Sequence, residues 1–101
     1  MAYAIKRTFE LDPPATVSGT VKAIQDAIAS FGGVLEVSVR GELSGDGLVG
    51  LQVEVVVVAN DSTKAGALAR QAIRDAIRWT GLSERSFRLT SGSGREVSPS
   101  S

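Results

Sequence analysis

The sequence contains no cysteine and no histidine among its 101 residues. Without cysteine, the chain cannot form disulfides, use a thiolate nucleophile, or hold zinc or iron–sulfur clusters through cysteine. Without histidine, it has no Ser-His-Asp triad, no histidine-ligated metal and no imidazole acid–base chemistry. We therefore predict that the protein is not an enzyme, and we identify no catalytic, cofactor-binding or metal-binding residue. We expect it to use neither a cofactor nor a metal.

Excess charge is also absent, because eleven basic residues balance eleven acidic ones. This balance argues against a general attraction to nucleic acid or to anionic membranes. The longest apolar run, residues 55–59, is far shorter than the roughly 18 residues of a membrane helix. Lys6, Arg7 and Glu10 interrupt the N-terminal segment, unlike a signal peptide. We therefore expect a cytoplasmic protein, and the rich use of alanine, valine, glycine and arginine suggests a bacterial one.

In the N-terminal half, the spacing of apolar residues changes from the two-residue period of a strand to the spacing of a helix. Residues 3–11 alternate apolar and polar side chains, which predicts a half-buried strand in which Arg7 is the one charged residue on the apolar side. Asp12 and the two prolines after it are expected to end this strand, with Asp12 as a helix N-cap. A single apolar stripe at helical spacing follows, and Gly32-Gly33 ends that helix. The stripe consists of Val17, Val21, Ile24, Ile28 and Phe31.

The second half repeats the order strand, helix, strand. Residues 34–43 and 48–59 alternate like strands, and the turn-forming residues 44–47 between them predict a hairpin. A helix is predicted over 62–80, with an alanine-rich apolar face, and a short strand over 85–90. From residue 91 the composition turns to serine, glycine and proline, which is typical of a disordered tail or linker. Residues 1–90 are therefore expected to form a single domain, with 91–101 outside it.

The resulting β-α-β-β-α-β order predicts an α+β fold. Strands and helices that each carry one apolar face pack as two layers. Right-handed crossovers in both halves give a ferredoxin-like, four-stranded antiparallel sheet with two helices on one face.

Three arginines form the most informative polar feature. Arg70, Arg74 and Arg78 are spaced by four residues, so they form one row on the predicted second helix. Guanidinium groups match phosphate and carboxylate oxygens bidentately, which makes this row a candidate for binding nucleic acid or an acidic partner. A solvated helix face is the alternative interpretation.

The open face of the predicted sheet offers little chemistry. Glu36, Glu42 and Glu54 alternate there with Arg40 and Lys6, as expected of solvated cross-strand partners. An RNA-binding sheet of this fold carries aromatic side chains at its central positions. Here those positions hold Lys6, Thr8, Gln52 and Glu54, which argues against binding of single-stranded RNA.

The first half of the chain resembles the ACT domains, a family of small regulatory modules. The resemblance covers about thirty residues and consists of Asp12-Pro13-Pro14, the stripe of Val21, Ile24 and Ile28, and Gly32-Gly33 before the apolar alternation of 34–39. It implies the same ferredoxin-like fold and a ligand-sensing role. The glycine of the family's opening loop is replaced by Pro14 and Ala15, so no ligand-binding residue is carried over.

These patterns predict a small non-enzymatic interaction module that homodimerises through its open sheet face or edge. Val56 and Val58 extend apolar character onto that face and are the candidate oligomer contacts. Two alternatives remain: an ACT-like small-molecule sensor, and binding of nucleic acid or an acidic partner through Arg70, Arg74 and Arg78.

Overall fold

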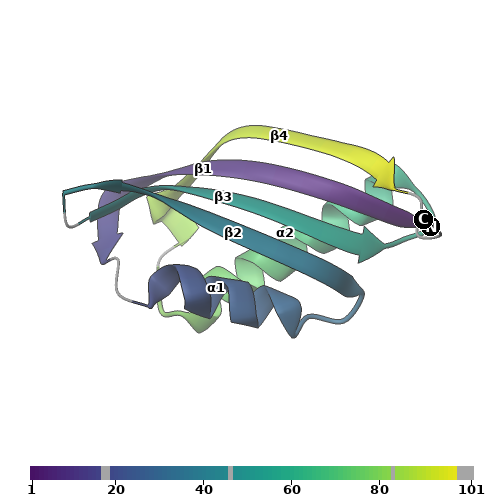
Figure 1. Ribbon diagram of the computed structural model, residues 1–101, viewed down its shortest axis with the longest axis horizontal. Coiled ribbons are helices and arrows are strands. Elements are labelled where there is room, and N and C mark those ends of the chain that lie inside the picture. The colour runs from purple at the N-terminus through teal and green to yellow at the C-terminus, as the bar shows by residue number, and fades with distance from the viewer. Residues whose placement is uncertain (17–18, 46, 83, 98–101) are drawn as a thin grey trace.

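The computed structural model describes residues 1–16, 19–45, 47–82 and 84–97 (Figure 1). Four strands and two α-helices follow the predicted order. They are β1 (Ala2–Thr16), α1 (Thr20–Ala29), β2 (Val34–Ser44), β3 (Gly47–Val58), α2 (Ser62–Trp79) and β4 (Phe87–Val97), with a 3-10 turn, η1 (Glu84–Ser86), before β4.

The four strands form one sheet in the order β2-β3-β1-β4, and every neighbouring pair is antiparallel. Both helices cover the same face of this sheet, and the other face is open (Figure 1). The predicted ferredoxin-like α+β fold is therefore confirmed.

The core lies between the helices and the inward side of the two central strands. Every second residue of β3 is buried there, and these side chains meet the stripe of α1 and the alanine face of α2. The largest fully buried side chains are Ile24, Ile28, Leu48, Leu51, Val53, Val55 and Val57. Small alanines on α2 let that helix pack closely, because they place little bulk between it and the sheet.

Helix α2 begins and ends where the sequence predicts. Asp61 is its N-cap, and its side chain accepts a 2.8 Å hydrogen bond from the backbone N–H of Lys64. This bond satisfies one of the N–H groups that lack a partner at the start of a helix. Among the described residues, neither α2 nor any other helix combines the length and apolar character needed to cross a membrane.

The start of α1 differs from the expectation. β1 does not end at Asp12 but extends to Thr16, and α1 begins at Thr20 after the left-handed Gly19. Proline donates no ladder hydrogen bond, so the β1–β3 pairing skips from Glu10 to Ala15 while the extended backbone continues. Asp12 is therefore not the N-cap of this helix. Val17, the first residue of the predicted stripe, lies outside the described residues.

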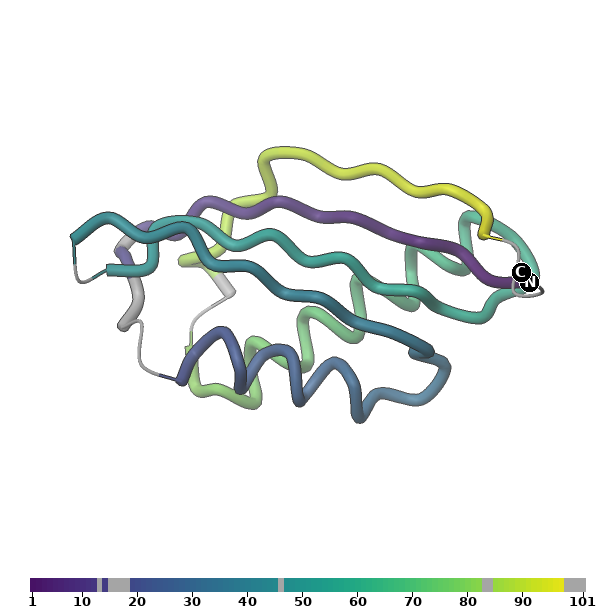
Figure 2. The backbone as a smooth tube through the Cα atoms, viewed as in Figure 1, coloured from purple at the N-terminus to yellow at the C-terminus, as the bar shows by residue number. Residues whose placement is uncertain are grey.

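The C-terminal strand is longer than predicted. β4 runs beside β1 along most of its length and pairs with it as far as Val97, opposite Ala2 (Figure 2). Residues 91–97, expected as part of a disordered tail or linker, are thus part of the sheet. Backbone hydrogen bonds to β1 hold them there, since a sheet ladder depends on the main chain and tolerates serine and glycine at an edge.

Candidate functional site

Two adjoining cavities lie between α2 and the strands β1 and β4, and we call them together the α2–β4 trough. The larger has a volume of about 770 Å³ and the smaller about 220 Å³, and Arg7 and Leu89 line both. The larger cavity is also lined by Tyr3, Ile5, Ser62, Gly66, Gly92, Ser93, Gly94, Arg95 and Glu96. The smaller is also lined by Phe9, Arg70, Ile73, Arg74, Ile77 and Phe87. The smaller cavity therefore has mostly apolar walls and a few polar groups, the usual character of a small-molecule site, whereas the larger cavity is open and has polar and apolar residues alike.

Arg7 is the central polar group of the trough. It lies on the helix-facing side of β1, as the alternation predicts, and is half-buried. Its Nη1 donates to the backbone carbonyls of Lys6, at 2.9 Å, and Ser93, at 3.2 Å. Among the described residues no carboxylate lies within ion-pair distance of Arg7, Glu96 of the same cavity included. No carboxylate among the described residues therefore offsets the charge of this guanidinium, and its remaining donors can bind a ligand.

Two glycines make the room that Arg7 occupies. A Cβ built on Gly92 of β4 would stand 3.0 Å from Nη1 of Arg7, and one built on Gly66 of α2 would stand 3.8 Å from Nη2. The guanidinium therefore lies between an edge strand and a helix at points where neither carries a side chain. The glycine-rich segment that suggests disorder in the sequence has this packing role in the structure.

Aromatic and aliphatic side chains form the walls of the smaller cavity. Phe9 of β1 and Phe87 of β4 pack edge to face, with ring centroids 6.2 Å apart and an interplanar angle of 81°. Ile73 and Ile77 of α2 also line it, and both are buried. The aromatic pair thus joins the two neighbouring strands β1 and β4 along this wall.

The arginine row is only partly associated with the trough. Arg70 and Arg74 line the smaller cavity, whereas Arg78 does not. All three side chains are exposed. Their role in binding a partner stays a prediction, but two of them bring further positive charge to the same cavity as Arg7. The sequence pattern marked Arg7 as the misfit of its strand, and that is the signal that could have identified it as a site residue.

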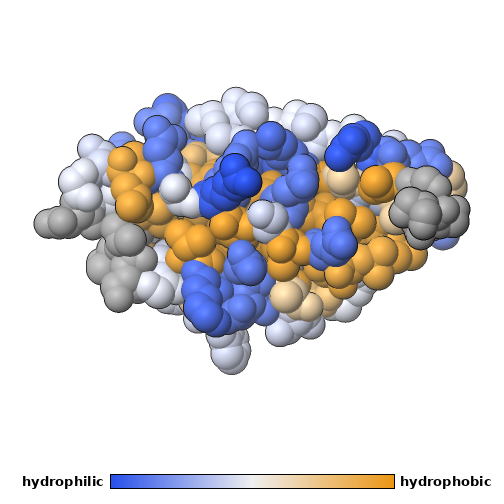
Figure 3. Space-filling model, viewed as in Figure 1, coloured by the Kyte–Doolittle hydropathy of each residue, from blue (hydrophilic) through white to orange (hydrophobic). Residues whose placement is uncertain are grey.

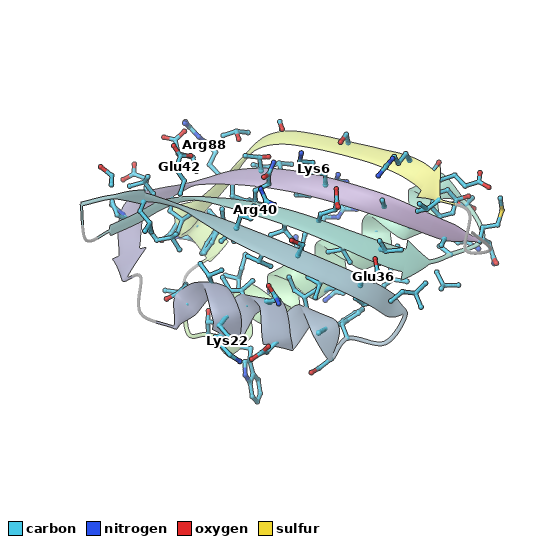
Figure 4. The ribbon with its side chains drawn as sticks, in the orientation of Figure 1. Lys6, Lys22, Glu36, Arg40, Glu42 and Arg88 are labelled. Carbon is cyan, nitrogen blue, oxygen red and sulfur yellow. The ribbon has the colours of Figure 1, made fainter. Side chains whose placement is uncertain are left out.

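The open sheet face carries mixed charge in its middle and apolar residues at one end. Lys6 of β1 and Arg40 of β2 lie in the middle of this face (Figure 4). Glu42 and Arg88 lie farther from the N-terminus, toward the other end of the sheet. Hydrophobic residues reach the surface toward the end of the sheet where the N-terminus lies (Figure 3). Val58 is 47% exposed there and Val56 is partly exposed. Self-association through these two valines stays a prediction.

No metal centre is evident in the part of the chain that the structure describes, since its acidic residues form no group of three or more that could hold an ion. The trough itself contains one carboxylate, that of Glu96, among its described lining residues. The groups of the larger cavity that can take part in chemistry include Arg7, the carboxylate of Glu96 and the hydroxyl groups of Tyr3, Ser62 and Ser93.

Comparison with known proteins places the chain among ferredoxin-like structures. No protein-family model and no curated protein matches it. A solved structure described as protein YJCS aligns with a TM-score of 0.63 at 6% identity, covering 97% of this chain and 100% of the other. A putative antibiotic biosynthesis monooxygenase from Chloroflexus aurantiacus aligns at 0.57 and 17% identity, covering 100% and 97%. SnoaB, a cofactor-independent oxygenase from Streptomyces nogalater, aligns at 0.50 and 14%, covering 99% and 95%.

These neighbours correct the expectations that the protein is a non-enzymatic module and that it is not an enzyme. Proteins described as oxygenases share this fold over nearly the whole chain, which contradicts the prediction of a non-enzymatic module. The absence of cysteine and histidine excludes particular mechanisms, but it does not exclude a reaction in which the substrate supplies the reactive electrons. The resemblance of the first half to ACT domains is consistent with the fold, while two of the aligned structures are described as a putative antibiotic biosynthesis monooxygenase and as a cofactor-independent oxygenase.

Proposed function

We propose that this protein is an oxygenase that acts on an organic substrate whose apolar part binds in the α2–β4 trough. The observation that carries the proposal is the juxtaposition of an apolar, aromatic-walled cavity with a cation, Arg7, that has no carboxylate partner among the described residues. The fold shared with proteins described as a putative monooxygenase and as a cofactor-independent oxygenase supports the reaction class.

The proposed reaction needs a substrate that supplies its own electrons. A ketone with an activated methylene can do so: the CH₂ group and O₂ become a carbonyl group and water. One oxygen atom enters the product and the other leaves as water, and the four electrons that reduce O₂ come from the methylene carbon. The first step is loss of a proton from that carbon, which gives an enolate that reacts with O₂.

Arg7 can stabilise the negative oxygen of the enolate in this reaction. Its guanidinium stabilises a negative oxygen more strongly in a water-poor site than in bulk water, because the surroundings screen the interaction less. Phe9, Phe87 and Ile73 line the smaller cavity, and an apolar substrate bound against them displaces water from the same region. The hydroxyl of Tyr3 and the carboxylate of Glu96, which both line the larger cavity, are the candidates to exchange the proton. The trough thus favours the reactive form of the substrate without a histidine.

Oxygen consumption tests the proposal. The probe is 2-tetralone, a bicyclic ketone with a benzylic methylene next to its carbonyl, incubated with the full chain under ¹⁸O₂. We expect O₂ uptake above autoxidation and one ¹⁸O atom in the product, with both lowered at least tenfold in Arg7→Met. Lys22→Met, on α1 and outside both cavities, is the control for loss of one positive charge and should retain the activity. Uptake no faster than autoxidation, for 2-tetralone and for related aryl ketones, would contradict the proposal.

We also propose that two copies associate through the open sheet face. Lys6, Arg40 and Glu54 line one shallow cavity of that face, about 220 Å³ in volume, and none of them takes part in an ion pair among the described residues. A two-fold copy can place its Glu54 against Lys6 and Arg40 of the other, because an isologous interface repeats each contact twice. Partly exposed Val56 and Val58 supply the apolar part of the same surface.

A further inference from the structure

We infer that the α2–β4 trough selects organic anions with a bicyclic-sized apolar body, binding the negative group at Arg7 and the body in the smaller cavity. This inference deepens the proposed function, because it names the class of substrate for the same site. It can be tested by binding alone, without turnover.

The position of Arg7 at the boundary of the two cavities carries the inference about charge. Its Nη1 is held by the carbonyls of Lys6 and Ser93, so the guanidinium has a fixed place. Its Nη2 lies toward Gly66, across the trough. A fixed, half-buried cation without a carboxylate partner among the described residues is incompletely compensated, and an anionic ligand supplies the missing charge. Bidentate binding then makes a carboxylate, a sulfonate or an enolate the matching group.

The smaller cavity sets the size of the apolar body. Its volume of about 220 Å³ equals that of roughly seven waters in the liquid, at about 30 Å³ each. Two fused six-membered rings fill such a space, and the edge-to-face pair of Phe9 and Phe87 offers an aromatic wall to them. The larger cavity is bordered by Ser62, Gly92 and Ser93, so it suits the polar remainder of the ligand.

Charge at the rim of the smaller cavity agrees with an anionic ligand. Arg70 and Arg74 of α2 line it, and with Arg7 they give it three cationic side chains. No aspartate or glutamate is among its described lining residues. A neutral chain that gathers positive charge at one cavity attracts anions there and not over its whole surface.

A matched pair of fluorescent probes tests the inference on the full chain. 1-Anilinonaphthalene-8-sulfonate carries a bicyclic body with an anionic group, and N-phenyl-1-naphthylamine is the same molecule without the sulfonate. We expect the wild type to bind the sulfonate at least about tenfold more tightly, the worth of one charge-assisted hydrogen bond. Arg7→Met should abolish this preference and leave the neutral probe unaffected, while Arg7→Lys should restore part of it.

A second pair of variants places the probe in the trough. Leu89 lines both cavities and is 55% exposed, so replacing it leaves the fold intact. Leu89→Asp should weaken binding of the sulfonate probe at least fivefold more than the isosteric Leu89→Asn does. The two variants should bind the neutral probe with equal affinity.

The inference is overturned if the wild type binds both probes equally, binds neither, or keeps its preference in Arg7→Met. These results are independent of the oxygenase assay. Selective binding without O₂ uptake would reject the proposed reaction alone, and O₂ uptake without selective binding would reject this inference alone.

Discussion

Gly92 lies directly against Arg7: a Cβ at position 92 would stand 3.0 Å from Nη1 of Arg7 and 3.1 Å from its Cδ. Gly92→Ala should therefore displace the guanidinium, which is the flexible end of a long side chain, and leave the edge strand in place. We expect anilinonaphthalene sulfonate binding to weaken several-fold. The free energy of unfolding should change by less than about 1 kcal/mol, because alanine is also the better strand former. Fluorescence titration and urea denaturation measure the two effects, and unchanged binding would contradict this account of Gly92.

Gly66 faces the same arginine from α2, but with more room. The nearest atom to a Cβ there is Nη2 of Arg7 at 3.8 Å, an ordinary contact. Gly66→Ala should therefore stabilise α2 by about 0.5–1 kcal/mol, the usual gain of alanine over glycine inside a helix. The midpoint of urea unfolding should rise without a change of slope. A lower midpoint would show that α2 and β4 approach each other too closely for a methyl group.

Strand β3 and helix α2 could be predicted from the sequence because their apolar periods are uninterrupted. Arg7 could be placed too, since one charge among the apolar positions of a strand stands out. Its function as a site residue could not, because that depends on Gly92 and Gly66, which are more than fifty residues away in the sequence. Nothing local indicates which glycine makes room for which side chain.

Where sequence reasoning failed, tertiary pairing outweighed local propensity. The segment around Ser93 looks disordered by composition, yet its main chain pairs with β1. The alternation of residues 34–43 places Leu35 and Val37 on the same face of the strand, but the register shift between Val34 and Glu36 leaves Leu35 57% exposed. Such an irregularity turns a side chain to the other face without changing the apolar pattern that predicted its direction.

The N-cap of α2 offers a direct test of local stability. Asp61→Ala removes the carboxylate that accepts the 2.8 Å hydrogen bond from the Lys64 N–H, so it should lower the free energy of unfolding by about 1 kcal/mol. Asp61→Asn keeps a side-chain oxygen and should lose less. Equal stability of the alanine variant and the wild type, measured by urea denaturation, would show that the cap does not hold in solution.

The three arginines of the row, Arg70, Arg74 and Arg78, should differ in their effect on binding of the sulfonate probe. Arg70 and Arg74 line the smaller cavity, so the double alanine variant should bind the sulfonate probe about two- to fivefold more weakly, with a reduced dependence on salt. Arg78→Ala should leave binding unchanged and change the free energy of unfolding by no more than about 0.5 kcal/mol. Titrations at two ionic strengths measure this difference, and an equal loss in both variants would contradict the prediction.

Self-association is the remaining prediction, and Val58 is the residue on which to test it. A stable dimer buries about 800 Å² on each copy, roughly an eighth of this protein's 6110 Å² surface. We expect sedimentation velocity well above micromolar concentration to give twice the 10.5 kDa mass of one chain.

Val58→Lys should dissociate that dimer, because a two-fold axis brings the new charge into the interface twice and each charge must be desolvated. Trp79→Lys is the matched control: Trp79 is 82% exposed, but it lies at the end of α2 in the helical layer, away from the open sheet face. Its replacement should leave the dimer intact. A wild-type chain that sediments as a monomer, or a dimer that survives Val58→Lys and is lost in Trp79→Lys, would show that the open sheet face is not the surface of association.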